Sequence, residues 1–244
     1  MLIDLHTHSQ YSADGYMSPR TIIKTSLKKG LGGVAVTDHN TIKGGLKTIK
    51  CLETELKTLK NEFKVIVGSE VSTTQGEIIG LFLNEEIKSR EPVDVMEEIR
   101  DQDGMVVIPH PFDVIRKESF TPQKEHLKLI HKIEVFNSRC VKSQFNRDAL
   151  EFASKYDLGC IAGSDAHFAN ELGKAGIEIG NHNMDKSDLR NKQRKSDSEI
   201  GKIDLENVNL RQVILNNQYT VFGVKSSFIN HGFTKLLKTW RKLR

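Results

Sequence analysis

Cysteine is scarce in this sequence, and its placement excludes two kinds of small stabilised domain. The 244 residues contain three cysteines, Cys51, Cys140 and Cys160. Their number is odd, they lie far apart and no C-x-x-C pair occurs, which argues against a disulfide framework and against a thiolate zinc site. We expect all three to be reduced packing residues.

Long apolar runs are also missing. No stretch approaches the roughly 18 apolar residues of a membrane-spanning helix. The first residues, MLIDL, lack the basic and long apolar regions of a secretory signal peptide. The apolar fraction of 37% and the charged fraction of 28% are typical of a globular chain. We therefore expect a cytoplasmic protein with no membrane span.

Acidic residues are absent from residues 207–244, which carry seven lysines and arginines. The whole chain has 36 basic and 32 acidic residues and a net charge of +4. Without those seven basic residues, residues 1–206 hold 29 basic against 32 acidic side chains, a net charge of −3. This asymmetry favours an anionic partner such as nucleic acid, although a few lysines on an amphipathic helix are usually a solvated face.

Short β-rich runs alternate with helical stretches through residues 1–180. Apolar runs predict strands at residues 2–5, 33–37, 65–67, 78–83, 105–108, 133–136 and 160–162. Helices are predicted between them, the first beginning at Ser18-Pro19 and ending at Gly30. This alternation predicts an α/β fold with a parallel sheet or barrel.

Two further segments follow this core. Residues 181–204 are almost free of large apolar side chains and rich in both charges, which predicts a mobile loop. Residues 205–244 are a basic C-terminal extension, expected to complete the barrel or to dock on it. The extension is predicted to hold a short helix near residues 205–215, a hairpin-like YTVFG segment and a final amphipathic helix.

Histidines and acidic residues gather just beyond the ends of the predicted strands. They are His6 and His8, Asp38 and His39, Glu70, His110, Glu134 and Asn137, and Asp165 and His167. In a parallel barrel these strand ends share one rim, where barrel enzymes place their sites. Imidazole and carboxylate together suit divalent metals, and so many candidate ligands predict more than one ion.

Seven motifs in this order resemble those of the PHP family, the polymerase and histidinol phosphatase metal-dependent phosphoesterases. They are DLHTHS, YSADG, TDHNT, GSEVST, PHPFD, EVFNSR and GSDAHF, and they span roughly residues 1–180. The resemblance implies a distorted (βα)7 TIM-like barrel with two or three divalent ions. The metals it implies are Mn, Zn or Fe, with Mg as a further option.

The resemblance also implies a ligand set. His6, His8, Glu70 and Asp165 would hold one metal, and Glu70 would bridge to a second that also takes His110. Asp14, His39 and His167 would hold the third. Glu77 stands where many family members have a histidine, so it is either a ligand of the second metal or a supporting residue.

The implied activity is hydrolysis of a phosphate ester by a metal-bridging hydroxide. Asp165, His39 and His167 are the predicted catalytic residues, and the leaving oxygen would take its proton from His39, from His167 or from a metal-bound water. Arg139 and Asn137 are predicted to bind substrate, with Arg20, Lys43 and Arg116 as weaker candidates for gripping phosphate. The substrate would be a phosphorylated small molecule, a nucleotide or a nucleic-acid end.

Two other functions stay open from the sequence. Amidohydrolase-type C–N hydrolases are also barrels that begin with H-x-H and end with a metal-binding aspartate. A barrel of this kind can also serve as a non-catalytic, nucleic-acid-binding scaffold. So many ligand-type residues argue against the scaffold, because uncompensated charge in a cleft is costly.

Overall fold

A computed structural model gives the fold of residues 1–180 and 209–227 and of five later positions, Asn230, Gly232, Thr234, Leu237 and Thr239. The predicted loop of residues 181–204 and most of the predicted last helix lie outside these residues. No helix in the part of the chain that the structure describes is long and apolar enough to cross a membrane.

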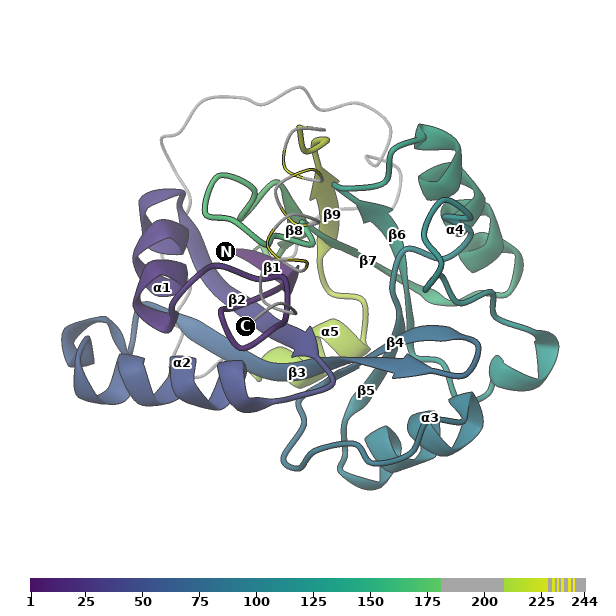
Figure 1. Cartoon of the computed structure of the whole chain (residues 1–244), viewed down its shortest axis with the longest axis horizontal. Helices are drawn as coiled ribbons and strands as arrows, with labels where there is room; N and C mark the ends of the chain where they lie inside the picture. Colours follow the sequence, from purple (N-terminus) through teal and green to yellow (C-terminus); the bar gives the residue numbers. More distant parts are fainter. Residues whose placement is uncertain are drawn as a thin grey trace.

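One sheet dominates the described chain, with strand order β7-β6-β5-β4-β3-β2-β1-β8-β9 (Figure 1). Its strands are β1 Leu2–Thr7, β2 Leu31–His39, β3 Lys64–Thr73, β4 Gly76–Leu81, β5 Met105–Ile108, β6 Lys132–Asn137, β7 Gly159–Gly163, β8 Ala175–Glu178 and β9 Thr220–Gly223. The predicted YTVFG segment forms β9, which pairs with the distant β8 rather than within a local hairpin.

Four of the eight neighbouring strand pairs in the described sheet are parallel and four are antiparallel, so the predicted parallel sheet is only partly present. Strand β4 is antiparallel to both β3 and β5, and β8 is antiparallel to β1. Only two residues separate β3 from β4, and a parallel connection needs a crossover of about a dozen residues or more. The short turn therefore dictates the antiparallel pairing.

The first and last parallel strands meet at the rim. The Asp165 backbone N–H donates to the His6 carbonyl at 2.8 Å, and the His8 N–H donates to the Ala166 carbonyl at 2.8 Å. These bonds join the segment after β7 to the end of β1. The result is a mixed α/β fold with a nearly closed, barrel-like sheet, and segments far apart in sequence share one mouth.

Helices lie around the outside of the sheet (Figure 1). They are α1 Pro19–Lys28, α2 Lys43–Thr54, α3 Pro92–Asp101 and α4 Ser143–Lys155, with short 3-10 turns at Lys57–Leu59 and Lys124–His126. Helix α1 begins as predicted, because the Ser18 hydroxyl accepts a hydrogen bond from the Thr21 N–H and Pro19 occupies the first turn.

The interior of the barrel is apolar below the rim. Side chains from most strands form one cluster there with Leu210 and Ile214 of helix α5 (Leu210–Leu215). The Lys132 ammonium, at the start of β6, donates to the Leu215 carbonyl at 3.2 Å. Helix α5 therefore closes the end of the barrel where the parallel strands begin, and leaves the opposite end for polar side chains.

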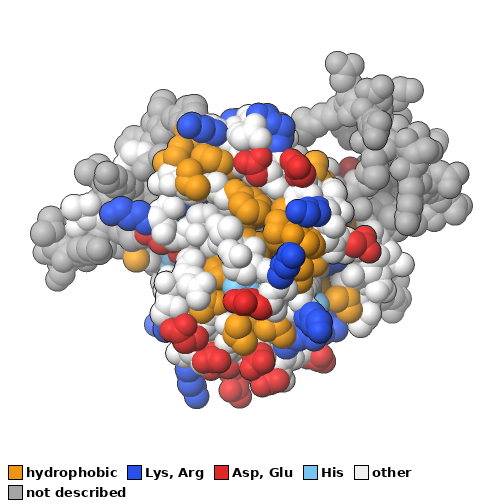
Figure 2. All heavy atoms as spheres, turned by 90° about the vertical axis from the view of Figure 1, so that its right-hand side faces the viewer, with side chains coloured by type: hydrophobic (Ala, Val, Ile, Leu, Met, Phe, Trp, Pro, Cys, Tyr) orange, Lys and Arg blue, Asp and Glu red, His pale blue; other side chains and the backbone are white. Residues whose placement is uncertain are grey.

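Apolar and charged side chains are unevenly distributed over one face of the molecule (Figure 2). Figure 2 shows one face, with apolar side chains gathered in the middle and acidic ones along the lower edge. That edge is at the level of α3 in Figure 1. The sequence of this helix, PVDVMEEIRD, carries four acidic residues and one basic residue.

Candidate metal centre

All nine predicted metal ligands come together at the rim of the barrel. Their side chains form four overlapping groups, and within each group one donor atom per residue lies within 4.8 Å of the others. The groups are His8, Asp14, His39 and His167; His6, Glu70 and His110; His6, His8 and Asp165; and His39, Glu70 and Glu77. The rim that the sequence predicts is thus an assembled cluster of imidazoles and carboxylates.

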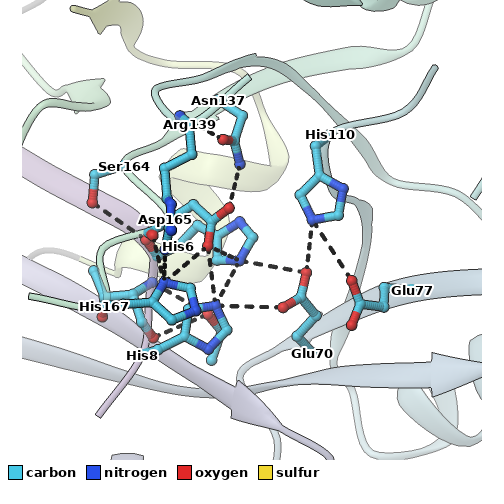
Figure 3. A network of polar contacts seen from close by, with 12 residues as sticks. His6, His8, Glu70, Glu77, His110, Asn137, Arg139, Ser164, Asp165 and His167 are labelled. Carbon is cyan, nitrogen blue, oxygen red and sulfur yellow. Dashed lines mark hydrogen bonds and ion pairs between the residues drawn. The ribbon is translucent and has the colours of Figure 1, made fainter. Parts of the chain in front are cut away.

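The group of His6, His8 and Asp165 is built from β1 and the segment after β7 (Figure 3). The Nε2 atoms of His6 and His8 lie 3.2 Å apart. Asp165 Oδ1 lies 3.3 Å from His8 Nε2 and 3.7 Å from His6 Nε2. The backbone of Asp165 has φ 54°, a left-handed conformation unusual for a residue with a Cβ, which aims its carboxylate into the group.

The tautomer of His6 indicates that this group fits a cation. His6 Nδ1 lies 3.0 Å from Glu134 Oε1, and because an ionised carboxylate can only accept, the ring proton must be on Nδ1. Nε2 then faces His8, Glu70 and Asp165, and this set of atoms favours a cation here, either a second ring proton or a metal ion. A metal ion among these atoms would satisfy them all, and the bond to Glu134 is the support that metal-binding histidines usually have.

Glu70 lies at the centre of the cluster and divides its two oxygens between neighbouring groups. Its Oε1 is 3.0 Å from His110 Nε2 and 3.5 Å from His6 Nε2. Its Oε2 is 3.4 Å from His8 Nε2 and 3.2 Å from His39 Nδ1. Glu70 is therefore shared by the histidines of neighbouring groups.

Asp14 links the two histidines of the third expected site. Its Oδ2 lies 3.4 Å from His39 Nε2, and its Oδ1 lies 3.4 Å from His167 Nε2. His167 Nδ1 lies 2.9 Å from the carbonyl oxygen of Asp165, and its Nε2 faces Asp14. The structure also places His8 in this group, which the sequence assigns to another ion.

Glu77 reaches the rim because β4 is antiparallel. A residue at the start of a parallel strand would lie at the opposite end of the barrel, but Glu77 pairs with Ser72, two residues beyond Glu70 on the neighbouring strand. Its Oε1 is 3.2 Å from His39 Nδ1 and its Oε2 is 3.9 Å from His110 Nε2. Burial and the nearby Glu70 charge raise the pKa of Glu77.

Burial and neighbouring charges shift the pKa values of His6 and His8 in opposite directions. Burial alone would lower the pKa of His6, but the carboxylates of Glu134, Glu70 and Asp165 outweigh it and raise that pKa well above its usual range. Burial, with the neighbouring His167 and His39, lowers the pKa of His8 to about 3. The buried carboxylates therefore demand positive charge, for which protons and metal ions compete.

Arg116 and Asn137 fix the second oxygen of Asp165. Arg116 donates to Asp165 Oδ2 at 2.7 Å and to Asn137 Oδ1 at 3.3 Å, and its side chain is 23% exposed. The Asn137 amide also donates to Glu134 Oε2 at 2.9 Å. The Arg116 charge outweighs the effect of burial and holds the pKa of Asp165 well below its usual range.

The other basic candidates lie in different settings. Arg139 is buried, with its guanidinium 2.5 Å from His167 Nδ1. Arg20 forms an exposed ion pair with Glu55, and Lys43 lies over the ring of Tyr11. The structure thus brings Arg139 and Arg116 to the cluster, while the contacts of Arg20 and Lys43 are with residues outside it.

No role was predicted from the sequence for two buried aspartates, Asp4 and Asp38, that hold the motif loops in place. Asp4 accepts from the N–H groups of Ser164, at 3.0 Å, and Gly173, at 2.8 Å. Asp38 accepts from both the N–H and the hydroxyl of Ser9 at 2.6 Å. The available signal was an acidic residue within an apolar strand, where an ionisable group without partners is unfavourable.

Comparisons with known proteins agree with this geometry. The family model described as the PHP domain matches residues 4–201. The uncharacterised protein MJ0417 of Methanocaldococcus jannaschii is 37% identical over 194 residues, which cover 77% of this chain and 74% of that protein.

Solved structures share the fold at low sequence identity. A two-domain protein from Bacteroides vulgatus, which contains a predicted PHP-like metal-dependent phosphoesterase, matches with a TM-score of 0.59 at 19% identity. That match covers 72% of this chain and 58% of the other. PsfC from Pseudomonas syringae matches with a TM-score of 0.59 at 12% identity over 99% of this chain and 98% of its own. The family model and the archaeal relative together show that the chain belongs to the PHP domain family.

Proposed function

We propose that the chain is a metal-dependent phosphoesterase that hydrolyses phosphate monoesters, or the phosphate groups of nucleotides and nucleic-acid ends. The observation that supports this function most is the convergence of nine imidazole and carboxylate side chains on one rim. Family membership supports the same reaction class.

Two or three divalent ions would be shared among these side chains. In this proposal His6, His8, Glu70 and Asp165 hold one ion, Glu70 with His110 and Glu77 holds a second, and Asp14, His39 and His167 hold a third. The mixed nitrogen and oxygen donors fit Mn, Zn or Fe, and Mg less well. Bound ions would supply Lewis acidity, which lowers the pKa of water and offsets negative charge on a phosphoryl group.

The chain's own residues would orient the centre and handle protons. Glu134 keeps the proton of His6 on Nδ1, and Arg116 leaves Asp165 one oxygen to present to a metal. His39 is the most open of the five histidines, with 18% of its side chain exposed. Whichever of His39 and His167 is not saturated by metal would give a proton to the leaving oxygen.

Arg139 is the proposed substrate-binding cation, with Arg116 as a second. Asn137 is fully buried, and its amide is already bonded to Glu134, Arg116 and the Arg139 backbone. Its contacts favour a role in supporting Asp165 and Arg139 over direct contact with substrate.

The proposal is tested by phosphate release from mononucleotides, 3′,5′-bisphosphates, histidinol phosphate and oligonucleotides with Mn, Zn or Mg. His8→Ala and Asp165→Asn should lose activity by at least about a hundredfold, because each removes a ligand of the first ion. Asp94→Ala, on the exposed side of α3, is the matched control and should keep full activity. Full activity in the two rim variants would reject the site.

A structural neighbour from Chromobacterium violaceum is described as an amidohydrolase, with a TM-score of 0.52 at 16% identity. The same screen should therefore measure ammonia and amine release from amide and deaminase substrates. Phosphate without ammonia supports the phosphoesterase, and the reverse result would favour C–N hydrolysis.

A further inference from the structure

The chain leaving β9 emerges at the rim that carries the metal centre. Strand β9 is antiparallel to β8, which is antiparallel to β1, so β9 runs in the same direction as β1. Beyond it, the Val224 N–H donates to the Lys174 carbonyl at 2.7 Å, and the Ser226 N–H donates to the Ser138 carbonyl at 2.8 Å. The C-terminal segment therefore runs beside the residue that precedes Arg139.

Farther along this segment, Thr234 contacts the guanidinium of Arg139. The Arg139 NH2 group donates to the Thr234 hydroxyl oxygen at 2.8 Å. That hydroxyl donates its own proton to the Asn230 carbonyl at 2.9 Å, so its oxygen is left to accept. The side chain of Asn230 in turn accepts from the Asn170 amide at 3.2 Å, close to the segment that follows His167.

The other end of the same guanidinium faces the metal centre. Arg139 NH1 lies 2.5 Å from His167 Nδ1, and Arg139 Nε lies 3.6 Å from Glu171 Oε1. Only 4% of the Arg139 side chain is exposed, so its donors depend on protein acceptors for their hydrogen bonds. Thr234 supplies one of these acceptors from a part of the chain remote in sequence.

We propose that Thr234 is a positioning residue, which holds the Arg139 guanidinium against His167 and so makes the C-terminal segment part of the substrate side of the centre. The proposal rests on the proposed phosphoesterase function, in which Arg139 binds the substrate phosphate. Thr234 itself touches neither metal ligand nor substrate and acts through Arg139.

Thr234→Val and Thr234→Ser test this role in the full-length, Mn-loaded protein. Valine keeps the shape of threonine but cannot accept a hydrogen bond, so KM for the best phosphate ester should rise about three- to tenfold, the effect of losing one hydrogen bond. Serine restores the hydroxyl and should keep KM within about twofold of wild type. kcat should change less than KM in both variants.

Thr54→Val is the matched control. Thr54 also donates to a helical carbonyl, that of Lys50 at 2.7 Å. It is exposed at the end of α2, a helix that holds none of the nine candidate metal ligands. Its KM should be unchanged. Thermal melts of all three variants separate a change in KM from a loss of folded protein.

A second readout does not depend on turnover. In the Zn-loaded protein, whose metal is diamagnetic, the ring ¹⁵N signals of His167 report its hydrogen bonding, and they should shift in Thr234→Val but not in Thr234→Ser or Thr54→Val. If wild type releases no phosphate while these signals still shift, the proposed function fails and the positioning role stands. Wild-type activity with unchanged KM and unchanged His167 signals in Thr234→Val would overturn the positioning role.

Discussion

Individual candidate ligands of the centre could be proposed from the sequence because strand ends are easy to place in it. His6, His39, Glu70 and Asp165 each follow an apolar run, and parallel strands bring such positions to one rim. The partners of these ligands were not predictable in the same way. The bond from Arg116 to Asp165 joins residues 49 positions apart, through a loop whose path no local pattern determines.

Glu134 allows a test of how one buried carboxylate supports a metal-binding histidine. Its two oxygens hold the His6 ring and the His110 N–H, so Glu134→Gln keeps the shape but weakens the acceptor that fixes the His6 tautomer. We expect Mn affinity to fall about 10- to 100-fold, as for other residues that support metal ligands. Titration calorimetry measures it.

Glu125→Gln is the control for that variant, because the Glu125 side chain is 76% exposed. It should bind Mn as wild type does. Equal Mn affinity in both variants would contradict the role given to Glu134.

Among the elements, β4 is the strand whose direction the sequence did not reveal. Alternation of strands and helices favours parallel pairing, but a two-residue connection overrides that tendency. The direction of β4 decides the chemistry, since it brings Glu77 rather than a residue near Leu81 to the rim.

Glu77→His should move metal preference toward Zn, because imidazole favours Zn relative to a carboxylate. The expected outcome is a several-fold rise in the ratio of Zn to Mn affinity, measured by competition between the two ions. An unchanged ratio would mean that Glu77 supports the centre without binding a metal.

His131, in the segment between β5 and β6, is expected to make the stability of the fold depend on pH. His131 Nδ1 accepts from the Val106 N–H at 2.9 Å, which ties this segment to β5. Burial, with the positive charges of Arg100 and Arg211, lowers the pKa of His131 to about 4. The unfolded chain, with a histidine pKa near 6.5, binds more protons between these two values.

This difference stabilises the fold above pH 6.5, and the stabilisation is lost as the pH falls toward 4. Between pH 7 and 5 the free energy of unfolding should drop by an amount on the order of 1 kcal/mol from this group. His131→Asn keeps an acceptor without titrating, so its metal-free urea melts should show a smaller drop than wild type. Identical pH profiles would rule out His131 as a contributor.

At the scale of the whole molecule, the prediction of a barrel with one polar mouth is consistent with the nearly closed sheet and the rim cluster. The closure itself, through the bonds of His6 and His8 to the segment after β7, needed the structure, because it pairs residues from the two ends of the core. The uneven distribution of charge along the sequence is also a property of the whole molecule. The basic residues of the C-terminal extension predict that it binds a polyanion such as nucleic acid.

Replacing Lys235, Lys238 and Arg241 with glutamine tests that prediction while keeping Thr234. Affinity for single-stranded oligonucleotides should fall, and the slope of log affinity against log salt should flatten by about 0.7 for each lost phosphate contact. Replacing Lys57, Lys60 and Lys64 instead controls for the loss of positive charge alone. An unchanged slope would mean that these basic residues do not bind a polyanion.

The proposed function depends above all on divalent metal bound by the rim cluster. The most direct measurement is elemental analysis of the purified protein after Mn loading and dialysis, with phosphate release measured on the same samples. We expect two or three ions per chain and activity that disappears with chelation and returns with Mn. Fewer than one ion per chain in wild type, or phosphate release that persists undiminished after complete metal removal, would contradict it.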